Sequence, residues 1–274
     1  LKSGVDFFLG YSPERVNPGD KKRTIDKINK VISGQNKKVE TILFDIYSKL
    51  TEGEIFLAKN IKVAEASKVI ENAQRDINIA FINEVAKICS KLNISIYDVL
   101  DASNTKWNFL PFLPGLVGGH CIGVDPYYLS HKAKELSVDP EVILSGRRTN
   151  DNMPKFIFNE IQKRLKKKAN ILFLGVTFKE DVPDLRNSKA IELLSFFRQP
   201  KFDILINDPF INDSTHIKYK DLIEKSFDAI ILTVPHTFYK EKFLHIKKLL
   251  KKDGILFDIK GIFRNKNMKN YWSL

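Results

Sequence analysis

Four short apolar runs in the last third of the chain decide its fold, and the first is NILFLGVTF at residues 170–178. Helical patterns at 188–198 and 238–252, with a short one near 221–225, separate these runs. Strands that alternate with helices indicate βαβ units, and right-handed crossovers then build a parallel sheet. We therefore expect a Rossmann-like α/β domain here. The other three runs are FDILINDPF at 202–210, DAIILTVPH at 228–236 and GILFDIKGIF at 254–263.

The turn after the first of these strands lacks the glycine fingerprint of a dinucleotide-binding domain. It reads LGVTFKEDVPD at 174–184, without G-x-G-x-x-G, so we expect another ligand, or a nucleotide bound in another way. Lys179 and Arg186 follow the strand, and Ser188 can cap the next helix. Cations beside a helix N-terminus favour a phosphate site. Lys260, in DIKG, offers a further cation at another strand end.

The middle of the chain is helical by its pattern. Apolar residues recur at three- and four-residue steps from about residue 54 to residue 92, and no proline or glycine interrupts this run after Gly53. A single helix of this length would extend over about 50 Å, which suggests a spine or a dimer interface. Shorter helical patterns cover 24–33, 39–50, 95–103, 126–136 and 140–165.

The beginning of the chain has a different pattern. VDFFLGYSPERVNPGD, at 5–20, predicts a strand that enters a loop rich in proline and glycine. A strand needs neighbours to be stable, and none precedes this one. We therefore expect that the chain lacks an N-terminal portion.

Composition limits the classes of function. The 274 residues are 43% hydrophobic, which is typical of a globular chain with room for two modest domains. The net charge of +12 allows three interpretations: a nucleic-acid partner, solvated lysine-rich faces, or attraction of an anionic small substrate. Because neither a recognition motif nor a clustered basic helix is present, we expect no nucleic-acid partner. No run approaches the roughly 20 apolar residues of a membrane span, so we expect no membrane insertion. Two cysteines without a recognisable signal peptide favour a reducing cytoplasm.

One cysteine stands in an unusually flexible and polar stretch, GLVGGHCIGVDPYYL, at 115–129. Gly118 and Gly119 allow the backbone to approach a ligand closely or to adopt a positive φ. If a helix begins near Cys121, the cysteine shares a face with Asp125, and the helix N-terminus makes the thiol more acidic, as a nucleophile requires. The alternative is a small buried residue in a tight turn. The adjacent histidine has no second pair of side chains at ligand spacing, so we expect no metal.

Two further groups of polar residues can be either catalytic or structural. Lys68, Asn72 and Arg75 lie in EASKVIENAQRDINIAFINE, where the lysine and the asparagine share one helical face. They could aim a cation and an amide at a developing oxyanion, or form the polar side of an amphipathic helix. Glu14 and Arg15 lie in a proline-bounded loop after a strand, where α/β enzymes keep catalytic groups, although a salt-bridged turn explains them equally well.

Four strings hold most of these residues: YSPERVNPGD, EASKVIENAQRDINIAFINE, KWNFLPFLPGLVGGHCIGVDPYYL and LGVTFKEDVPDLRNS. In them the chain resembles the UDP-glucose/UDP-mannuronate dehydrogenase family, and most of all its bacterial UDP-N-acetylhexosamine (GlcNAc/GalNAc) 6-dehydrogenases of surface-polysaccharide synthesis. The strings stand in the family's order and extend over nearly the whole chain. SPERVNPGD and GGHCIGVDPYYL favour the N-acetylhexosamine branch, while the choice of gluco, galacto or manno sugar stays open.

The resemblance implies three domains. Residues 1–36 would be the last piece of an NAD-binding Rossmann domain, 37–153 an all-helical central domain that forms a homodimer through its long helix, and 154–274 a Rossmann-like UDP-binding domain. It also implies NAD as cofactor and a UDP-N-acetylhexosamine as substrate. The implied reaction is two hydride transfers from C6, through a thiohemiacetal and a thioester on the cysteine, to the uronic acid. Because the glycine fingerprint is missing, we expect the chain to bind NAD poorly.

The resemblance also assigns roles to single residues. Cys121 would be the nucleophile, Lys68 and Asn72 would stabilise the oxyanion, and Glu14 would serve hydrolysis. Asp125 would act as a base or hold the attacking water. Arg186 and Lys260 would contact the cofactor or a phosphate. The residues implied to bind substrate are Arg15, Arg75, Gly118, Gly119, Tyr127, Phe178 and Lys179.

Two positions depart from the family's pattern. Pro18 stands where the UDP-glucose branch carries a second carboxylate, so proton handling in hydrolysis is expected to differ. Leu113 stands where relatives often show a basic or polar residue, so a substrate contact across the dimer is expected to be lost. Two alternatives stay open: a UDP-glucose or UDP-ManNAc 6-dehydrogenase, and a non-catalytic dimer that binds UDP-sugars.

Overall fold

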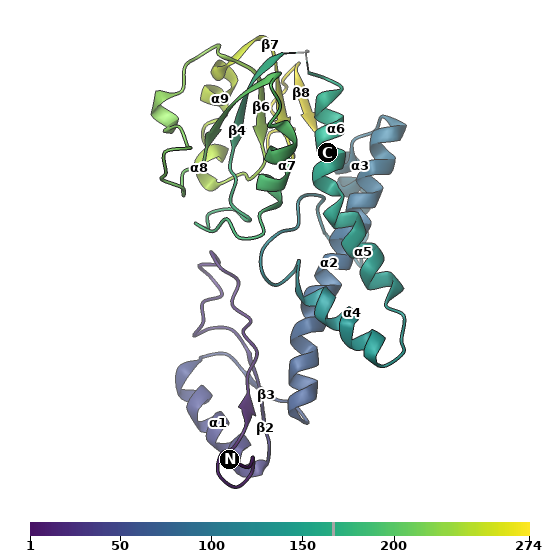
Figure 1. The fold of residues 1–274 in the computed structure, drawn as a ribbon, viewed down its shortest axis with the longest axis vertical. Helices are drawn as coiled ribbons and strands as arrows, with labels where there is room; N and C mark the ends of the chain where they lie inside the picture. The colour runs from purple at the N-terminus through teal and green to yellow at the C-terminus, as the bar shows by residue number, and fades with distance from the viewer. Residues whose placement is uncertain (166–167) are drawn as a thin grey trace. The chain divides into compact units, whose positions relative to one another are not determined.

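The computed structural model of the chain describes residues 1–165 and 168–274 (Figure 1). Contacts divide the chain into two compact units, Leu1–Gln74 and Arg75–Leu274. The long helix α2 (Ile61–Leu92) runs through the boundary between them. No helix in the described parts of the chain combines the length and the apolar character that a membrane span needs.

The first unit holds a small mixed sheet in the order β1-β2-β3. β2 (Lys30–Gly34) is buried at all five positions, lies antiparallel to β1 (Gly10–Tyr11) and parallel to β3 (Ile55–Leu57). Helix α1 (Lys37–Leu50) connects the two parallel strands, and the Asn36 side chain caps it by accepting a hydrogen bond from Val39 N–H at 3.1 Å. The strand expected within residues 1–20 is present only in part, since β1 has just two residues.

Two helical predictions in the first unit are wrong. Within 24–33, the chain turns and then forms the buried strand β2, because Val31 and Ile32 are β-branched and lie between two strand neighbours. The long helix does not begin at residue 54, because residues from Ile55 pair with β2 instead. It begins at Ile61, where Asn60 accepts a hydrogen bond from Val63 N–H at 2.9 Å.

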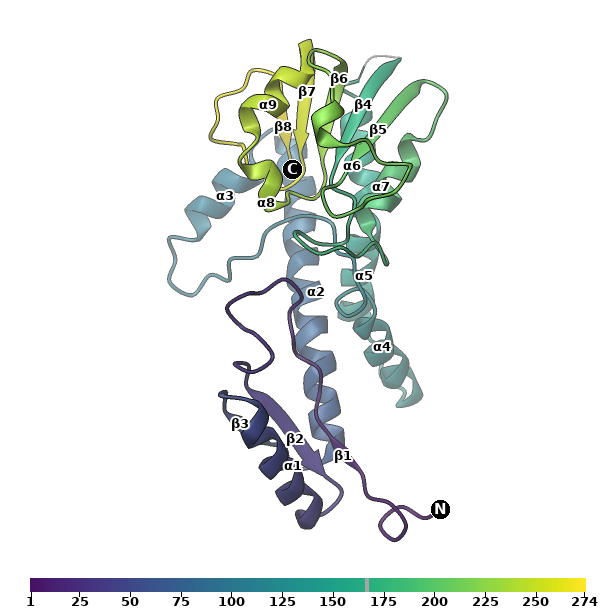
Figure 2. The ribbon, with the colours of Figure 1, turned by 90° about the vertical axis from the view of Figure 1, so that its left-hand side faces the viewer.

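The second unit starts with helices, as predicted. Helix α5 (Glu141–Asp151) packs against α2, because Gly146 allows the backbone of α5 to come close to Ile77 and Ala80. The predicted helix at 140–165 is two helices that meet at Asn152, where Pro154 lies in the first turn of the second one. Figure 2 shows α5 and α6 beside the part of α2 that belongs to this unit. The helices after α2 are α3 (Ile96–Ser103), α4 (Asp125–Glu135), α5 (Glu141–Asp151) and α6 (Met153–Gln162).

The last third forms the predicted parallel sheet, in the order β5-β4-β6-β7-β8 with every neighbouring pair parallel. The strands are β4 (Ala169–Leu174), β5 (Phe202–Asn207), β6 (Phe227–Leu232), β7 (Leu250–Asp258) and β8 (Tyr271–Ser273). The other elements are α7 (Lys189–Phe197), the 3-10 turn η1 (Tyr219–Asp221), α8 (Thr237–Lys240) and α9 (Phe243–Leu249). The helix predicted for 238–252 is therefore two short helices, and β7 already begins at Leu250, where its residues pair with β6.

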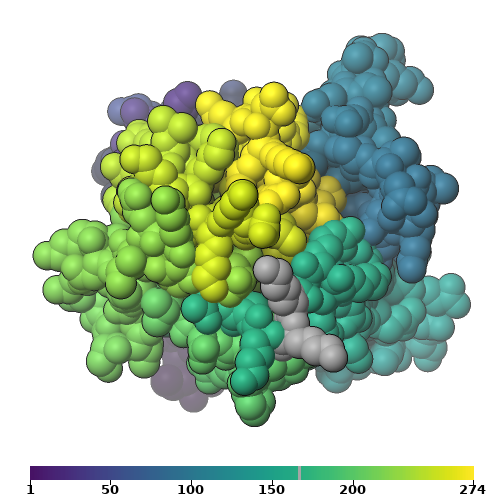
Figure 3. Space-filling model, turned by 90° about the horizontal axis from the view of Figure 1, so that it is seen from above, coloured from purple at the N-terminus to yellow at the C-terminus, as the bar shows by residue number. Residues whose placement is uncertain are grey.

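The sheet is covered on both faces, and alternate residues of β4 reach opposite cores. Ile171 and Phe173 pack in a core with α6 and α7, while Leu172 and Leu174 pack in another with α8 and α9. Burying each of these side chains fully contributes about 1.5–3 kcal/mol. Figure 3, which looks onto this unit, shows the C-terminal segment in yellow beside the helical region in blue and teal, and Leu274 belongs to the first core.

The topology sets the position of a ligand site. β4 lies between β5 and β6, so the connections from β4 and from β5 leave towards opposite sides of the sheet. In open parallel sheets, ligands bind outside the carboxyl ends of the strands at such a switch point. The loop after β4, residues 175–188, begins at this edge.

Candidate active site

Cys121 lies in a turn that precedes a helix. The residue is exposed. Its backbone carbonyl accepts hydrogen bonds from Val124 N–H at 3.0 Å and Asp125 N–H at 2.8 Å. Helix α4 begins at Asp125, which confirms the helix predicted for 126–136, so the condition of a helix start near Cys121 is not met. Pro126 accounts for the late start, since its φ and missing N–H suit the first helical turn. The alternative of a buried cysteine is wrong as well, because the thiol faces solvent.

The cysteine loop packs tightly on the loop that follows β4. A Cβ atom on Gly118 would lie 2.5 Å from the Asn187 carbonyl oxygen, and one on Gly119 would lie 2.9 Å from the Phe178 ring. Gly119 also has a φ of +90° and donates its N–H to the Asn187 carbonyl at 3.4 Å. Both glycines are therefore needed for close approach, as predicted, although the partner is protein backbone and an aromatic ring.

Charged side chains join the same two loops. His120 Nε2 lies 3.2 Å from Asp184 Oδ2, and Arg186 donates to both oxygens of Asp184 at 2.8–3.2 Å. Hydrogen bonds from the Arg186 side chain and amide, with His120 nearby, lower the pKa of Asp184 to about 2. Arg186, predicted to contact the cofactor, is 72% exposed and neutralises Asp184 in this structure.

Three lysines line one small pocket at the carboxyl ends of β4 and β6: Lys179, Lys189 and Lys260. Phe178 and Thr177 also line it, so the predicted residues Phe178, Lys179 and Lys260 lie together here. Lys260 Nζ lies 2.6 Å from Glu180 Oε1, and although burial opposes ionisation, this cation lowers the pKa of Glu180. Three lysine side chains on one pocket suit an anionic group such as a phosphate. The other lining residues are Leu116, Ala190, Thr233 and Val234.

Sequence reasoning missed Lys189. Its Nζ lies 2.6 Å from Glu192 Oε2 and 3.0 Å from Asp151 Oδ1, and although burial opposes the charge, these partners raise its pKa. The sequence did contain a signal for a special role of Lys189. Lys189 directly follows the capping residue Ser188, and a cation in a first helical turn is unusual because it opposes the helix dipole. The predicted cap itself is confirmed, since Ser188 Oγ accepts from Ile191 N–H at 3.4 Å.

A buried polar network holds the start of the cysteine loop. Asn83 on α2 accepts a hydrogen bond from Gly115 N–H at 2.8 Å and donates to the Gly115 carbonyl at 3.0 Å. Asn83 also donates to Asn150 at 2.8 Å, and Asn150 donates to the carboxylate of Asp76 at 2.7 Å. Asp76 in turn accepts from Arg147 at 2.6 Å, and all four side chains are at most 2% exposed. Burial raises the pKa of Asp76, and the guanidinium and the amide oppose that rise.

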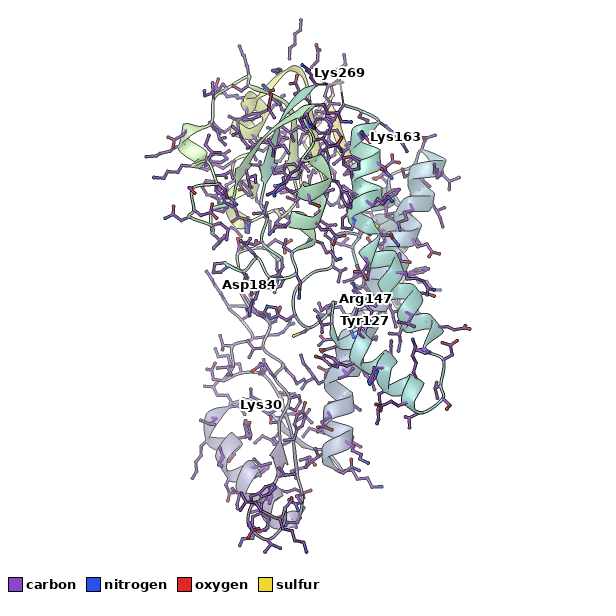
Figure 4. All side chains as sticks on the ribbon, viewed as in Figure 1. Lys30, Tyr127, Arg147, Lys163, Asp184 and Lys269 are labelled. Atoms are coloured by element: carbon purple, nitrogen blue, oxygen red, sulfur yellow. The ribbon has the colours of Figure 1, made fainter. Side chains whose placement is uncertain are left out.

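Tyr127, predicted to bind substrate, belongs to the edge of this network. Its hydroxyl donates to Asp151 at 2.9 Å, and the Arg147 guanidinium lies 5.8 Å from its ring centre. Figure 4 shows the labels of Tyr127, in the first turn of α4, and Arg147, on α5, next to each other. Arg147 also donates to Asp151 at 2.5 Å, so one arginine connects α2, α4 and α5.

The first unit holds the other predicted residues on a loop and on the first part of helix α2, and an ion pair joins the two segments. Arg15 NH2 lies 2.9 Å from Glu71 Oε1, and Arg15 also donates to the Asn29 carbonyl at 3.1 Å. This ion pair ties the loop with Glu14 to the helix segment that carries half-buried Lys68 and Asn72. Glu14 is exposed and accepts a hydrogen bond from Val16 N–H at 2.5 Å. The salt-bridged turn considered for Arg15 is thus present, and it also leaves Glu14 open to solvent.

The predicted residues therefore fall into two groups, one in each unit. Arg75 is exposed and begins the second unit, three residues after Asn72 on the same helix. Within the described residues, no group of three histidine, cysteine, aspartate or glutamate side chains could hold a metal ion. The βα turn after β2 reads GQN, at residues 34–36, and the described residues form no glycine-rich cradle of the kind that NAD phosphates use.

Two family models match the chain. The central domain of the UDP-glucose/GDP-mannose dehydrogenase family matches residues 62–152, and the UDP binding domain of the same family matches residues 172–265. Together these matches cover most of the sequence, and they fall on the helical region and on the parallel sheet. The chain belongs to the UDP-glucose/GDP-mannose dehydrogenase family, as the four strings predicted.

Individual relatives agree with this assignment. Protein CapL of Staphylococcus aureus is 50% identical over 97% of this chain and 65% of its own length. The UDP-N-acetyl-D-glucosamine 6-dehydrogenase of Pseudomonas aeruginosa is 43% identical over 95% of this chain and 65% of its own length. The chain thus spans about two thirds of these curated relatives.

Solved structures show the same fold. The UDP-D-ManNAc dehydrogenase of Pyrococcus horikoshii is 29% identical and superposes with a TM-score of 0.85 over all of this chain and 66% of its own. The UDP-N-acetyl-mannosamine dehydrogenase Cap5O of S. aureus is also 29% identical, with a TM-score of 0.82 over all of this chain and 65% of its own.

Proposed function

We propose that this chain carries the thiol-bearing and UDP-binding portions of a UDP-N-acetylhexosamine 6-dehydrogenase that serves surface-polysaccharide synthesis. One observation carries the proposal: the exposed thiol of Cys121 lies on a loop packed against Phe178, whose own loop lines a three-lysine pocket. A diphosphate held by these lysines would bring an attached sugar towards the cysteine loop. The identity to UDP-N-acetylglucosamine 6-dehydrogenases, at 42–43%, supports the sugar class.

The proposed chemistry explains why a thiol is needed. The C6 alcohol first loses a hydride and a proton to become an aldehyde. The thiolate of Cys121 then adds to this carbonyl, the π electrons move to oxygen, and a tetrahedral thiohemiacetal forms whose carbon carries a hydride to lose. Loss of that hydride and of the hydroxyl proton gives a thioester. Water finally attacks the thioester, the thiol leaves with a proton, and the uronic acid is released.

The remaining roles are proposals that follow the family resemblance. Lys68 and Asn72 would stabilise negative charge on the C6 oxygen, since a cation and an amide one helical turn apart converge on one point. Asp125 would hold the water or take its proton, and Glu14 would serve the hydrolysis step. NAD⁺ is the hydride acceptor that the resemblance implies, and we assign its binding to the whole protein rather than to residues of this chain.

Two other sugars are the main competitors. UDP-N-acetylmannosamine dehydrogenases are 31–33% identical to this chain, against 42–43% for the UDP-N-acetylglucosamine enzymes. A family enzyme for UDP-glucose, from Pyrobaculum islandicum, shares the fold at 21% identity. We therefore propose UDP-N-acetylglucosamine or its galacto epimer as substrate. A non-catalytic UDP-sugar-binding dimer is the competing class of function.

The long helix is the proposed dimer contact. Its second half exposes Phe81, Ile88 and Leu92 at 63%, 52% and 62%. These residues lie seven and four positions apart, so they form one stripe on the helix. A second copy of α2 would cover this apolar stripe.

The experiment that tests the function measures NADH formation by the whole protein as its gene encodes it. UDP-GlcNAc, UDP-GalNAc, UDP-ManNAc and UDP-glucose are supplied in parallel, with calorimetry of UDP binding to the present chain as a second measurement. Two NADH per molecule of UDP-GlcNAc or UDP-GalNAc is the expected result. Two NADH only from UDP-ManNAc or UDP-glucose would contradict the proposed sugar class. UDP binding without any NADH would favour the non-catalytic dimer.

A further inference from the structure

We infer that His236, a buried residue outside the pocket, is a positioning residue that sets the shape of the loop after β4 and so the affinity of the UDP site. The inference rests on the proposed function, because it concerns the loop that carries Phe178 and Lys179. His236 follows β6 and is fully buried, so its ring is held in one place. It does not line the three-lysine pocket.

One ring nitrogen of His236 holds the middle of the loop, at Asp181. Nδ1 lies 2.9 Å from the backbone nitrogen of Asp181, and because an amide N–H can only donate, Nδ1 must accept. Asp181 has a positive φ of +57°, a conformation that a residue other than glycine keeps only when its surroundings support it. The Asp181 carboxylate adds a second attachment, since it accepts from Thr237 N–H at 2.9 Å and from the Thr237 hydroxyl at 2.5 Å.

The other ring nitrogen holds the near end. With Nδ1 accepting, a neutral ring carries its hydrogen on Nε2, which lies 3.1 Å from Asp208 Oδ2 and 3.3 Å from Thr177 Oγ1. The Thr177 hydroxyl donates to the Lys179 carbonyl at 2.9 Å, so its oxygen is left to accept from Nε2–H. All three contacts thus require the same neutral tautomer of His236.

Asp208 completes the near anchor. It is fully buried at the end of β5, and one of its oxygens accepts from Val176 N–H at 2.7 Å and Thr177 N–H at 3.2 Å. Its other oxygen accepts from Phe210 N–H at 2.9 Å. Burial opposes ionisation of this carboxyl, yet the hydrogen bonds from His236 and these amides lower its pKa. The His236–Asp208 pair therefore fixes the loop at Val176, Thr177 and Asp181.

Between these anchors lie the three residues that matter for a ligand: Phe178, Lys179 and Glu180. Phe178 and Lys179 line the pocket, and Glu180 pairs with Lys260 of the same pocket. Loss of the Asp181 anchor would release the strained residue and let Lys179 move away from the other two lysines. His236 thus determines the spacing of the cations without touching the ligand.

Two substitutions separate the two ring nitrogens. The side-chain oxygen of His236→Asn reaches about the place of Nδ1 and can still accept from Asp181 N–H, whereas the amide of His236→Gln reaches about the place of Nε2 and can still donate to Asp208. The Gln variant loses the contact with Asp181 N–H, and the Asn variant loses the two contacts of Nε2, so both are expected to lower the melting temperature. The Gln variant is expected to weaken UDP binding by calorimetry about tenfold or more, and the Asn variant less than about threefold.

Controls keep the outcome clear. Ser103→Ala removes a half-buried hydroxyl on α3, which donates to the Val99 carbonyl at 2.8 Å, so it should lower stability and leave UDP affinity unchanged. Equal UDP affinity for the Asn and Gln variants, whether weak or as in the parent, would overturn the inference. Hydrogen exchange of the Asp181 amide is measured in the same variants and should be fast only in the Gln variant. If the parent chain binds no UDP, the proposed function fails, and this exchange rate still decides the anchor.

Discussion

At the scale of single residues, the proposed site depends on two glycines and a cysteine in one loop. Gly118 allows the loop to lie against the Asn187 carbonyl, and Gly119 does the same for the Phe178 ring. Cys121 is exposed in the turn that follows these glycines. A side chain at either glycine would move the thiol relative to the proposed UDP pocket.

Gly118→Ala is expected to weaken the contact between the two loops. The new Cβ would lie 2.5 Å from a backbone oxygen that has little freedom to move, which costs about 1–3 kcal/mol of unfolding free energy. Thermal melts measure the loss, and the rate of thiol alkylation at Cys121 measures loop movement. Gly123→Ala is the matched control, because its Cβ would meet nothing closer than 3.5 Å. Equal effects of the two substitutions would contradict the close-approach argument.

Cys121→Ser is expected to abolish release of the uronic acid by the whole protein. A serine ester at this position would form and be hydrolysed far more slowly than a thioester. The rate of the second oxidation should therefore fall by about a thousandfold or more. UDP affinity should be unchanged. Cys89→Ala is the control, since Cys89 is buried in the helical core and far from the exposed loop in sequence. Full two-step turnover in the serine variant would exclude the covalent mechanism.

Arg186→Ala is expected to raise the pKa of Asp184 from about 2 towards its ordinary value, because the bidentate hydrogen bonds disappear. A carboxylate with a lowered folded pKa contributes stability that is complete above its unfolded pKa and is lost as the pH falls through the folded value. In the variant the folded and unfolded pKa values are nearly equal, so this contribution should be absent above about pH 4, and the stability should depend less on pH between about pH 2 and pH 4. Carbon NMR of the Asp184 carboxyl group gives the midpoint, and an unchanged midpoint would contradict the assignment.

At the scale of the elements, one buried ion pair joins the helices that carry the cysteine loop. Arg147 on α5 binds Asp76 on α2, and Asn150 and Asn83 extend the network to Gly115. Asp76 Oδ2 and Arg147 Nε have no hydrogen-bond partner in the structure, so the network is not fully satisfied. Such a network contributes less to stability than its number of contacts suggests, but removing one partner leaves a buried charge.

Arg147→Met is expected to lower the unfolding free energy by about 3–5 kcal/mol, because Asp76 would stay buried without its guanidinium. Denaturant titration measures the change. Arg148→Met is the matched control, since Arg148 is exposed and its guanidinium donates to the Ser145 hydroxyl at 2.7 Å. The double variant Asp76→Leu, Arg147→Met should recover most of the loss. A loss below about 1 kcal/mol in the single variant would contradict the argument.

At the scale of the whole molecule, each unit presents its own part of the proposed chemistry. The first unit holds Glu14 and the helix segment with Lys68 and Asn72, and the second holds Cys121 and the lysine pocket. Helix α2 contributes residues to both units and carries the exposed stripe of the proposed dimer contact.

A double substitution on the exposed stripe of α2, Phe81→Asp with Ile88→Asp, is expected to convert the proposed dimer to a monomer. The side chains are 63% and 52% exposed, so the fold should tolerate charges that a dimer interface would not. Light scattering after size exclusion gives the mass, and circular dichroism checks the helix. Leu244→Asp, on α9 at 75% exposure, should leave the mass unchanged. A parent chain that is already monomeric would refute the dimer.

Much of the fold was predictable because periodicity is a local property of the chain. The apolar runs around Ile171, Leu205, Ile230 and Phe257 are short and bounded by turns, and all became strands of one parallel sheet. The failures lie where pairing partners overrode the local pattern. Lys30–Gly34 has a helical spacing of apolar residues, yet it is a strand because β1 and β3 flank it.

By itself, the sequence determined the fold class, the family and the cysteine loop, because strand runs and family strings are written in consecutive residues. Only the tertiary structure decided which side chains meet. Asp76 and Arg147 are 71 residues apart, and His236 lies 55 residues from Asp181, so no local pattern records that they bond. Burial then gives these contacts their importance, because a polar group withdrawn from water must find its partner within the fold.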